Sequence, residues 1–321
     1  MGSKPPATGI PGGVTQRKCP KKSGFGPVPL IMANHPTLLP REHGAYAELA
    51  FPLITGWAMA IPSLSALALG ASAVLFFLAN ESVAILLGVR GKRLHTQLGT
   101  PARARARTLM GLGAVLGLAG ILGAGPSVWP EILLPAAPGA LLIPTVLNGR
   151  QKTIPGEILV VTAFSTLVLP LAMASGADPD RAWAAACVWW VSFTLGTLEV
   201  HAIKASHKPT GRGDWTRWGS PLLSGAVVLA GFAVWLGPWA FSGVSGAGDL
   251  PVAAAGSDPA WFRGMAAALT RVLLHSVPAL LPPSVSVFGL SLLRVHPKHL
   301  KRVGWSLVGA NTLALVILLA G

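Results

Sequence analysis

Charged side chains are scarce in this chain. Asp, Glu, Lys and Arg make up 11% of its 321 residues, against about 25% in a soluble globular domain. Since 52% of the residues belong to the hydrophobic set AVILMFWYC, a water-soluble fold is excluded. The 2 cysteines are too few for a disulfide scaffold or a thiolate metal cage. The patterns GxxxxGKS/T, HExxH, GxSxG and CxxC are also absent, so the chain shows none of the chemistry that those patterns carry.

Long apolar runs fill the chain from Ala45 onward. A helix needs about 20 such residues to cross the hydrocarbon core of a bilayer. The sequence therefore predicts an all-α fold, a polytopic membrane bundle of about nine transmembrane helices. The predicted spans are residues 45–61, 64–87, 108–125, 130–147, 156–175, 182–203, 219–243, 265–293 and 303–320. Glycines in residues 111–125 are expected to permit close helix packing, and Trp189 and Trp190 to lie in an interfacial aromatic belt.

The first 40 residues differ from the rest of the chain. They scatter Lys and Arg among Gly, Pro, Ser and Thr without a periodic apolar face, which predicts a disordered basic tail over residues 1–40 before a transmembrane domain over residues 41–321. A cleaved signal would need an apolar core of about 7–15 residues, and residues 28–33 are too short. Translation starting at Met32 instead of Met1 is an open alternative, which the intact mass of the native protein would decide.

Basic residues gather in alternate connections between the predicted spans. They follow the second, fourth, sixth and eighth spans and precede the first, with Arg181, Arg263 and Arg271 as exceptions. Because short basic loops stay cytoplasmic, we expect the amino terminus inside the cell and the carboxyl terminus outside. Topology and attraction to anionic lipids then explain the net charge of +14, and no nucleic-acid partner is expected.

Ionisable and polar side chains cluster at the cytoplasmic ends of several spans. An ionisable group at membrane depth is costly unless it faces a partner or a wet cavity, so we expect these groups to converge on a polar cavity open to the cytoplasm. Glu81 and Glu199 are the candidate catalytic or metal-facing groups. The candidate substrate-binding residues are Glu42, His43, Glu48, Asn80, Arg90, Lys92, Arg93, Asn148, Arg150, Glu157, His201 and Lys204.

Structural readings compete with these assignments. Basic side chains at helix ends commonly extend to the lipid headgroups, which explains Arg103, Arg105, Arg107, Lys298, Lys301 and Arg302 without a ligand. Glu48, Glu81 and Glu199 either bind a ligand or tie helices together, and the sequence leaves both open. Glu199 and His201 are two residues apart and point to different helix faces, so no metal site is predicted and the cofactor is unknown.

Two motifs resemble those of a known family. Arg41-Glu42-His43-Gly44-Ala45-Tyr46, and later Ala79-Asn80-Glu81-Ser82-Val83 with Gly91-Lys92-Arg93, resemble the YwiC-like family of bacterial multi-pass membrane proteins. This resemblance implies an integral protein of a bacterial cytoplasmic membrane and does not imply a particular activity.

The predicted topology also looks like that of UbiA-type prenyltransferases, which place acidic Mg²⁺-binding motifs at the cytoplasmic ends of their second and sixth spans. Asn80-Glu81 and Glu199-Val200-His201 occupy those places here. Ala84 and Gly88 stand where further acids would be needed, so Mg²⁺ would keep mostly water as ligands. Basic residues such as Arg90, Lys92, Arg93, Arg150 and Lys204 offer direct charge-assisted hydrogen bonds to an anion instead.

Three functions remain open at this point. The first is binding or processing of a lipid-linked anion such as a prenyl diphosphate, with membrane lipids as the other partners. The second is a small-solute or ion permease in which Glu48, Glu81 and Glu199 relay a cation or proton. The third is a non-catalytic membrane protein. The polar groups lie toward one predicted face of the membrane, the cytoplasmic face, and no inverted repeat is evident. Since a transporter must open to both faces, binding or processing of a lipid-linked anion is preferred.

Overall fold

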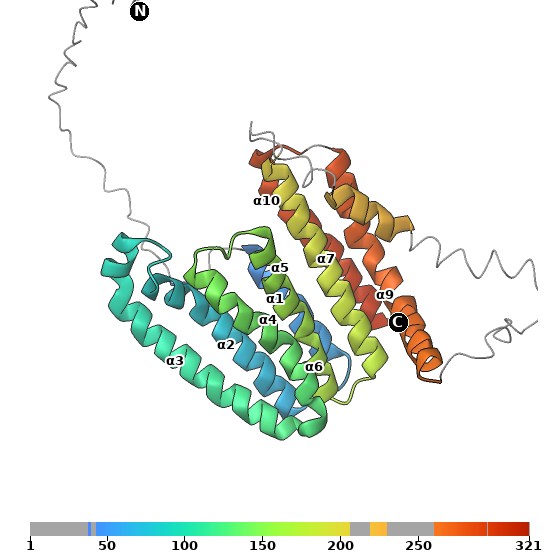
Figure 1. Cartoon of the computed structure of the whole chain (residues 1–321), viewed down its shortest axis with the longest axis horizontal. Coiled ribbons are helices and arrows are strands. Elements are labelled where there is room, and N and C mark those ends of the chain that lie inside the picture. The colour runs from blue at the N-terminus through green and yellow to red at the C-terminus, as the bar shows by residue number, and fades with distance from the viewer. Residues whose placement is uncertain (1–37, 40–42, 206–218, 230–259, 294, 321) are drawn as a thin grey trace, which may run out of the picture. The chain divides into compact units, whose positions relative to one another are not determined.

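The computed structural model describes residues 38–39, 43–205, 219–229, 260–293 and 295–320 (Figure 1). Over these ranges the regular structure is helical, with no β-strand, so the predicted all-α class is confirmed. The predicted tail, residues 1–40, lies outside the described residues except for 38 and 39. The helices are α1 (His43–Ala58), α2 (Leu64–Leu86), α3 (Lys92–Ala124), α4 (Trp129–Leu147), α5 (Ile154–Thr166), α6 (Val168–Ala174), α7 (Pro179–Ala205), a short helix Gly219–Leu229, α9 (Ala260–Leu292) and α10 (Leu300–Ala320).

Seven helical segments of the described ranges are long and apolar enough to cross a membrane. They correspond to seven of the nine predicted spans, with α5 and α6 together forming one segment, Ile154–Ala174. The first predicted span is α1, which has 16 residues. The seventh is described only as Gly219–Leu229, and the remainder of residues 219–243 lies outside the described ranges. The protein is an integral membrane protein, whereas the orientation of its termini stays a prediction.

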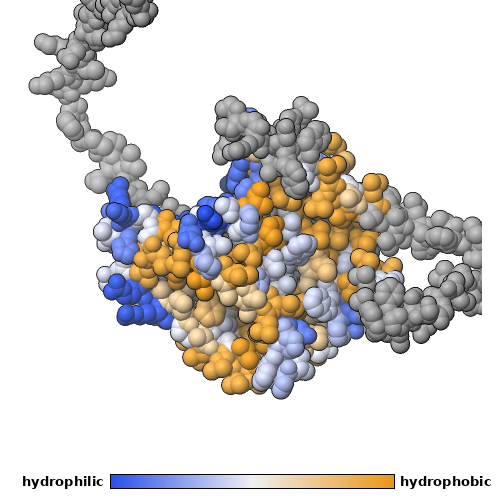
Figure 2. All heavy atoms as spheres, in the orientation of Figure 1, coloured by the Kyte–Doolittle hydropathy of each residue, from blue (hydrophilic) through white to orange (hydrophobic). Residues whose placement is uncertain are grey.

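The surface agrees with contact to lipid chains. Large apolar side chains are exposed along α3, α4 and α10, including Leu118 at 58%, Leu133 at 66% and Val316 at 56%. Figure 2 shows hydrophobic residues over much of one face, with hydrophilic residues gathered mainly beside the first half of α3. A soluble protein rarely exposes so much contiguous apolar surface.

One sequence prediction about an element boundary is wrong. Residues 92–107 form the first half of α3, which has 33 residues, and not a loop. Lys, Arg, Leu, Gln and Ala are good helix formers, so this basic stretch continues the helix to a length of about 50 Å, beyond the hydrocarbon core of about 30 Å. The predicted span over residues 156–175 is confirmed as the segment Ile154–Ala174. Its helix is interrupted between α5 and α6, because Pro170 cannot donate to the carbonyl of Thr166, the last residue of α5.

Helices α2 and α3 pack through a stripe of glycines, as predicted from residues 111–125. A Cβ atom at Gly117 would lie 2.8 Å from the hydroxyl oxygen of Ser72, and one at Gly120 would lie 2.7 Å from Cγ of Leu69. The Ser72 hydroxyl also donates to the carbonyl of Gly113 at 2.7 Å. Since lipid offers no hydrophobic driving force between helices, close backbone approach of this kind supplies much of the association.

Trp189 joins α7 to α1 at the centre of the core. Its side chain is fully buried and stacks between Phe51 and Phe193, at centroid distances of 5.2 Å and 5.7 Å. Its indole N–H donates to Oγ1 of Thr55 at 3.0 Å. The predicted interfacial place of Trp189 is therefore wrong, whereas Trp190 is 42% exposed and its N–H donates to Oγ1 of Thr162 at 3.0 Å.

Candidate functional site

A cavity of about 910 Å³ lies between α1, α2, α4, α5, α7 and α10. Much of its wall is apolar, with Phe76, Phe77, Phe164, Leu142 and Val308 among the lining side chains. The polar lining side chains are Glu48, Asn80, Arg90, Gln151, Lys152, Glu157, Ser192, Thr197, Lys204 and Asn311. An apolar cavity with a few polar groups is the usual form of a small-molecule site.

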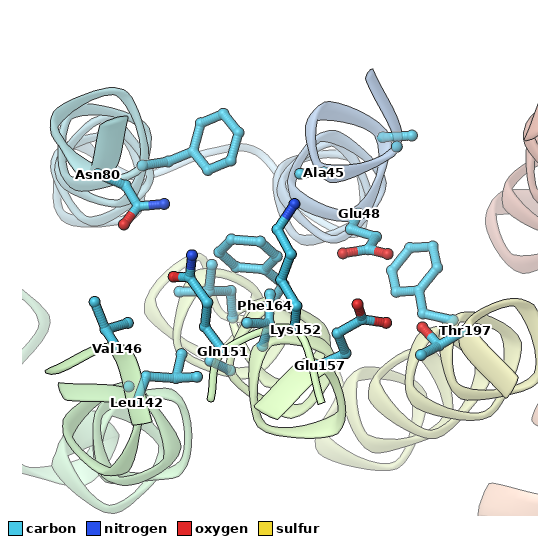
Figure 3. A pocket seen from close by; sticks show the side chains of 18 of the residues that line it. Ala45, Glu48, Asn80, Leu142, Val146, Gln151, Lys152, Glu157, Phe164 and Thr197 are labelled. Atoms are coloured by element: carbon cyan, nitrogen blue, oxygen red, sulfur yellow. The ribbon is translucent and has the colours of Figure 1, made fainter. Parts of the chain in front are cut away.

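The charged lining residues gather where several helices begin or end. Arg90 follows α2, Lys152 precedes α5, Lys204 is in the last turn of α7, and Glu48 and Glu157 lie near the starts of α1 and α5. Figure 3 shows the side chains of Gln151 and Lys152 extending between Asn80 on one side and Glu48 and Glu157 on the other. Helical segments far apart in the sequence thus place both signs of charge at one end of the cavity.

A tight turn after α2 brings Arg90 back onto its own helix. Gly88 and Gly91 have φ values of 72° and 95°, a backbone conformation that glycine adopts without steric cost. This turn lets Nη2 of Arg90 donate to Oε2 of Glu81 at 2.6 Å. The Glu81 side chain is only 6% exposed and that of Arg90 is 26% exposed. Nε of Arg90 is buried without a hydrogen-bond partner among the described residues.

A second polar pair fixes the start of α5. Nε2 of His201 lies 2.8 Å from Oε2 of Glu157, so α7 holds a carboxylate that lines the cavity. Glu157 is in the first turn of α5, where a negative charge also complements the helix dipole. His201 does not line the cavity, but it holds the Glu157 side chain, which does.

The turn between α4 and α5 carries Gln151 and Lys152 over the cavity. Oγ1 of Thr153 donates to the carbonyl of Arg150 at 2.7 Å and accepts from the backbone N–H of Gly156 at 3.4 Å. A Cβ atom at Gly156 would lie 2.7 Å from the carbonyl oxygen of Arg150 and 2.8 Å from that of Gln151. The turn therefore requires glycine at position 156.

Gly156→Ala is expected to displace this turn, because the added methyl group meets backbone oxygens that cannot move alone. We expect a loss of about 1–3 kcal/mol in the free energy of unfolding, the usual cost of overpacking. Gly111→Ala is the matched control, since a Cβ there meets nothing within 4 Å and alanine favours a helix. Thermal unfolding in detergent micelles measures both, and equal midpoints for the two variants would contradict this account of the turn.

The structure brings together five of the predicted site residues around the cavity: Glu48, Asn80, Arg90, Glu157 and Lys204. Seven others do not line it: Glu81, Lys92, Arg93, Asn148, Arg150, Glu199 and His201. Glu81 and His201 reach it indirectly, through Arg90 and Glu157. Glu42 and the side chain of His43 lie outside the described residues.

Glu199 belongs to a different set of contacts. It is 2% exposed, and its Oε2 accepts hydrogen bonds from the hydroxyls of Ser220 at 2.6 Å and Ser291 at 2.8 Å. These bonds tie α7 to helix Gly219–Leu229 and to α9. The spacing explains the difference, because Glu199 is rotated about 100° around α7 from the lining residue Val200. The structure therefore does not place Glu199 and Glu81 together at one site.

Comparison with known proteins identifies part of the chain. Residues 39–173, less than half of its length, match the family model described as "YwiC-like protein". These residues are similar to YwiC-like proteins, and we call them the YwiC-like segment. The YwiC-like segment runs from α1 to α6 and carries Glu48, Asn80, Arg90, Lys152 and Glu157, whereas α7 and α10 complete the cavity from outside it. No curated protein and no solved structure matches the chain, so the likeness to UbiA-type enzymes stays a prediction.

Sequence reasoning missed five polar lining residues: Gln151, Lys152, Ser192, Thr197 and Asn311. Asn311 could have been found from the sequence, because a polar amide within an apolar transmembrane run is unusual and marks a candidate functional group. The predicted site residues lie toward the cytoplasmic ends of the predicted spans, whereas Asn311 lies near the middle of α10. Gln151 and Lys152 gave no comparable signal, since a polar turn between spans is ordinary.

Proposed function

We propose that the protein binds an amphipathic anion, with the anionic head beside Arg90, Lys152 and Lys204 and the chain along the apolar wall. The observation that carries the proposal is the division of one cavity into a charged end and an apolar remainder. A volume of about 910 Å³ is at the upper end of the usual range for ligand pockets, roughly 300–1,000 Å³.

Arg90 is suited to hold an oxygen anion. A guanidinium has five N–H donors in a rigid fork, and the hydrogen bond to Glu81 uses Nη2. Glu81 therefore fixes the orientation of the fork and leaves other donors for a ligand. Charge-assisted hydrogen bonds from arginine to phosphate or carboxylate oxygens are about twice as strong as neutral ones.

Glu48 and Glu157 narrow the class of head group. Both carboxylates line the cavity and face the same space in Figure 3. A carboxylate accepts hydrogen bonds and repels a bare anion. A head group that combines oxygen anions with hydroxyl or amine donors, as many phospholipid head groups do, suits this mixed set better than free phosphate.

Equilibrium binding of dodecyl phosphate to the protein in lipid nanodiscs tests the proposal. Inorganic phosphate and dodecyltrimethylammonium serve as comparison ligands, and mass spectrometry of co-purified lipids identifies natural occupants. We expect dodecyl phosphate to bind tightest, because it alone combines a negative head with a chain. Weaker binding than the ammonium compound, or solute uptake by reconstituted vesicles without anion binding, would favour a permease instead.

Lys204→Ala is expected to weaken binding of dodecyl phosphate by about tenfold, since a hydrogen bond to a charged group contributes roughly 1.5–3 kcal/mol and Lys204 is exposed at the end of α7. Lys301→Ala is the matched control, because Lys301 is also exposed near a helix end but does not line the cavity. Equal losses in the two variants would mean that charge attracts the ligand only nonspecifically.

A further inference from the structure

Two buried polar side chains, with oxygen atoms unpartnered within the described part of the chain, line the cavity near the middle of α7 and α10. Asn311 of α10 is 6% exposed and Ser192 of α7 is 2% exposed, and both line the cavity. Neither Oδ1 of Asn311 nor Oγ of Ser192 has a hydrogen-bond partner among the described residues. Buried polar atoms are nearly always hydrogen-bonded in native proteins, so a partner is missing here.

Helix geometry directs Asn311 toward the cavity. The other lining residues of α10 are Gly304, Leu307 and Val308, and Asn311 follows them in the i, i+3, i+4, i+7 pattern of a single helix face. The cavity face of α10 is thus apolar except for this amide. Asn311 is placed to meet whatever occupies the cavity.

The two side chains lie far from the basic end. Ser192 precedes Lys204 by twelve residues on α7, a rise of about 18 Å. Both positions are near the middle of their helices, α7 of 27 residues and α10 of 21 residues. In hydrocarbon surroundings an unsatisfied polar group has no water to replace its partner.

We infer that Asn311 and Ser192 form an inner subsite that binds a hydroxyl group on the chain of the ligand. The inference rests on the proposed function, since it describes the far end of the same ligand. A hydroxyl both donates and accepts, so it satisfies the amide in either of its two orientations, which heavy-atom positions do not distinguish. The predicted ligand is an amphiphile with an anionic head and a polar group well along its chain.

Paired alkyl phosphates test the subsite. Alkyl phosphates from octyl to hexadecyl are compared with their ω-hydroxy counterparts, by equilibrium binding in lipid nanodiscs. The proteins are the full-length wild type, Asn311→Leu, Ser192→Ala and Ser165→Ala. Ser165 is the matched control, because it is fully buried with an unpartnered hydroxyl but does not line the cavity.

We expect the ω-hydroxyl to strengthen binding at least tenfold at one chain length, because only that length reaches the subsite. This gain should disappear in Asn311→Leu, shrink in Ser192→Ala and persist in Ser165→Ala. Plain alkyl phosphates should bind Ser165→Ala as tightly as wild type, and measurable binding of these ligands by Asn311→Leu shows that this variant is folded. If Asn311→Leu does not fold, a smaller gain in Ser192→Ala than in Ser165→Ala supports the subsite, and equal gains in these two variants contradict it.

Two results would overturn the inference. One is tight binding of alkyl phosphates without any hydroxyl preference, which leaves the proposed function standing and indicates that water fills the inner end. The other is a hydroxyl preference that survives in Asn311→Leu. A parallel series of ligands with a quaternary ammonium head separates the proposed function from the subsite. If the ω-hydroxyl strengthens binding in that series while the alkyl phosphates do not bind, the subsite is supported and the anionic head is contradicted.

Discussion

Arg90→Ala is expected to weaken binding of dodecyl phosphate by about a hundredfold and to lower the free energy of unfolding by about 3 kcal/mol. The binding loss follows from removing several charged donors, each contributing roughly 1.5–3 kcal/mol. The stability loss follows because the Glu81 carboxylate, 6% exposed, is left without its cation, and breaking a buried pair costs about 3–5 kcal/mol. The lower end applies because the Arg90 side chain is 26% exposed.

The double variant Arg90→Ala/Glu81→Ala separates the two effects. Removing both partners leaves no unpaired charge, so we expect most of the stability to return, as measured by chemical unfolding in micelles. Anion binding should stay weak, because the guanidinium is still absent. Glu81→Ala alone should destabilise the protein yet retain part of its anion binding. Wild-type affinity in the double variant would contradict the assignment of Arg90 as a ligand-binding residue.

Trp189→Ala is expected to lower the free energy of unfolding by about 4 kcal/mol, within the usual range of about 3–5 for a large buried aromatic residue. In lipid the loss comes chiefly from packing, since stacking on Phe51 and Phe193 and the bond to Thr55 all disappear. The contacts with Phe51 and Thr55 join α7 to α1, two walls of the cavity, so ligand binding should weaken as well.

Trp183→Ala is the matched control for this substitution. Trp183 lies on the same helix but is 41% exposed, so its loss should change the unfolding midpoint little. Trp189→Phe should recover much of the stacking and lose only the N–H bond to Thr55. Equal midpoints for Trp189→Ala and Trp183→Ala would contradict the central packing role of Trp189.

The all-α class and most of the spans could be predicted from sequence, because a span is a local property of about 20 consecutive residues. Helix boundaries could not be predicted where good helix-forming residues continue beyond the apolar run, as they do before residue 108 in α3. Arg103 and Arg107 belong to α3 although their charge suggested a loop. Pro170 was present in the sequence as a break signal, and the division of α5 from α6 follows from its missing N–H.

The site was only partly predictable, because convergence depends on which faces of separate helices meet. Position near a predicted cytoplasmic helix end was a useful guide to the cavity lining for Arg90, Glu157 and Lys204. It was a poor guide for Glu199, whose face of α7 meets Ser220 and Ser291 while the residue beside it, Val200, lines the cavity. Neighbouring residues on a helix point about 100° apart, so one position decides whether a side chain faces the cavity or another helix. Hydropathy does not show which side of a helix faces the cavity.

Photo-crosslinking with an alkyl phosphate that carries a diazirine at the end of its chain tests the central claim most directly. With the head at the basic end, the reactive carbon should lie at the inner wall and label peptides of α7 and α10 around Phe193 and Val308. Excess dodecyl phosphate should suppress this labelling. Labelling confined to lipid-facing residues such as Leu118 and Leu122 of α3, without competition, would contradict an amphipathic anion in the cavity.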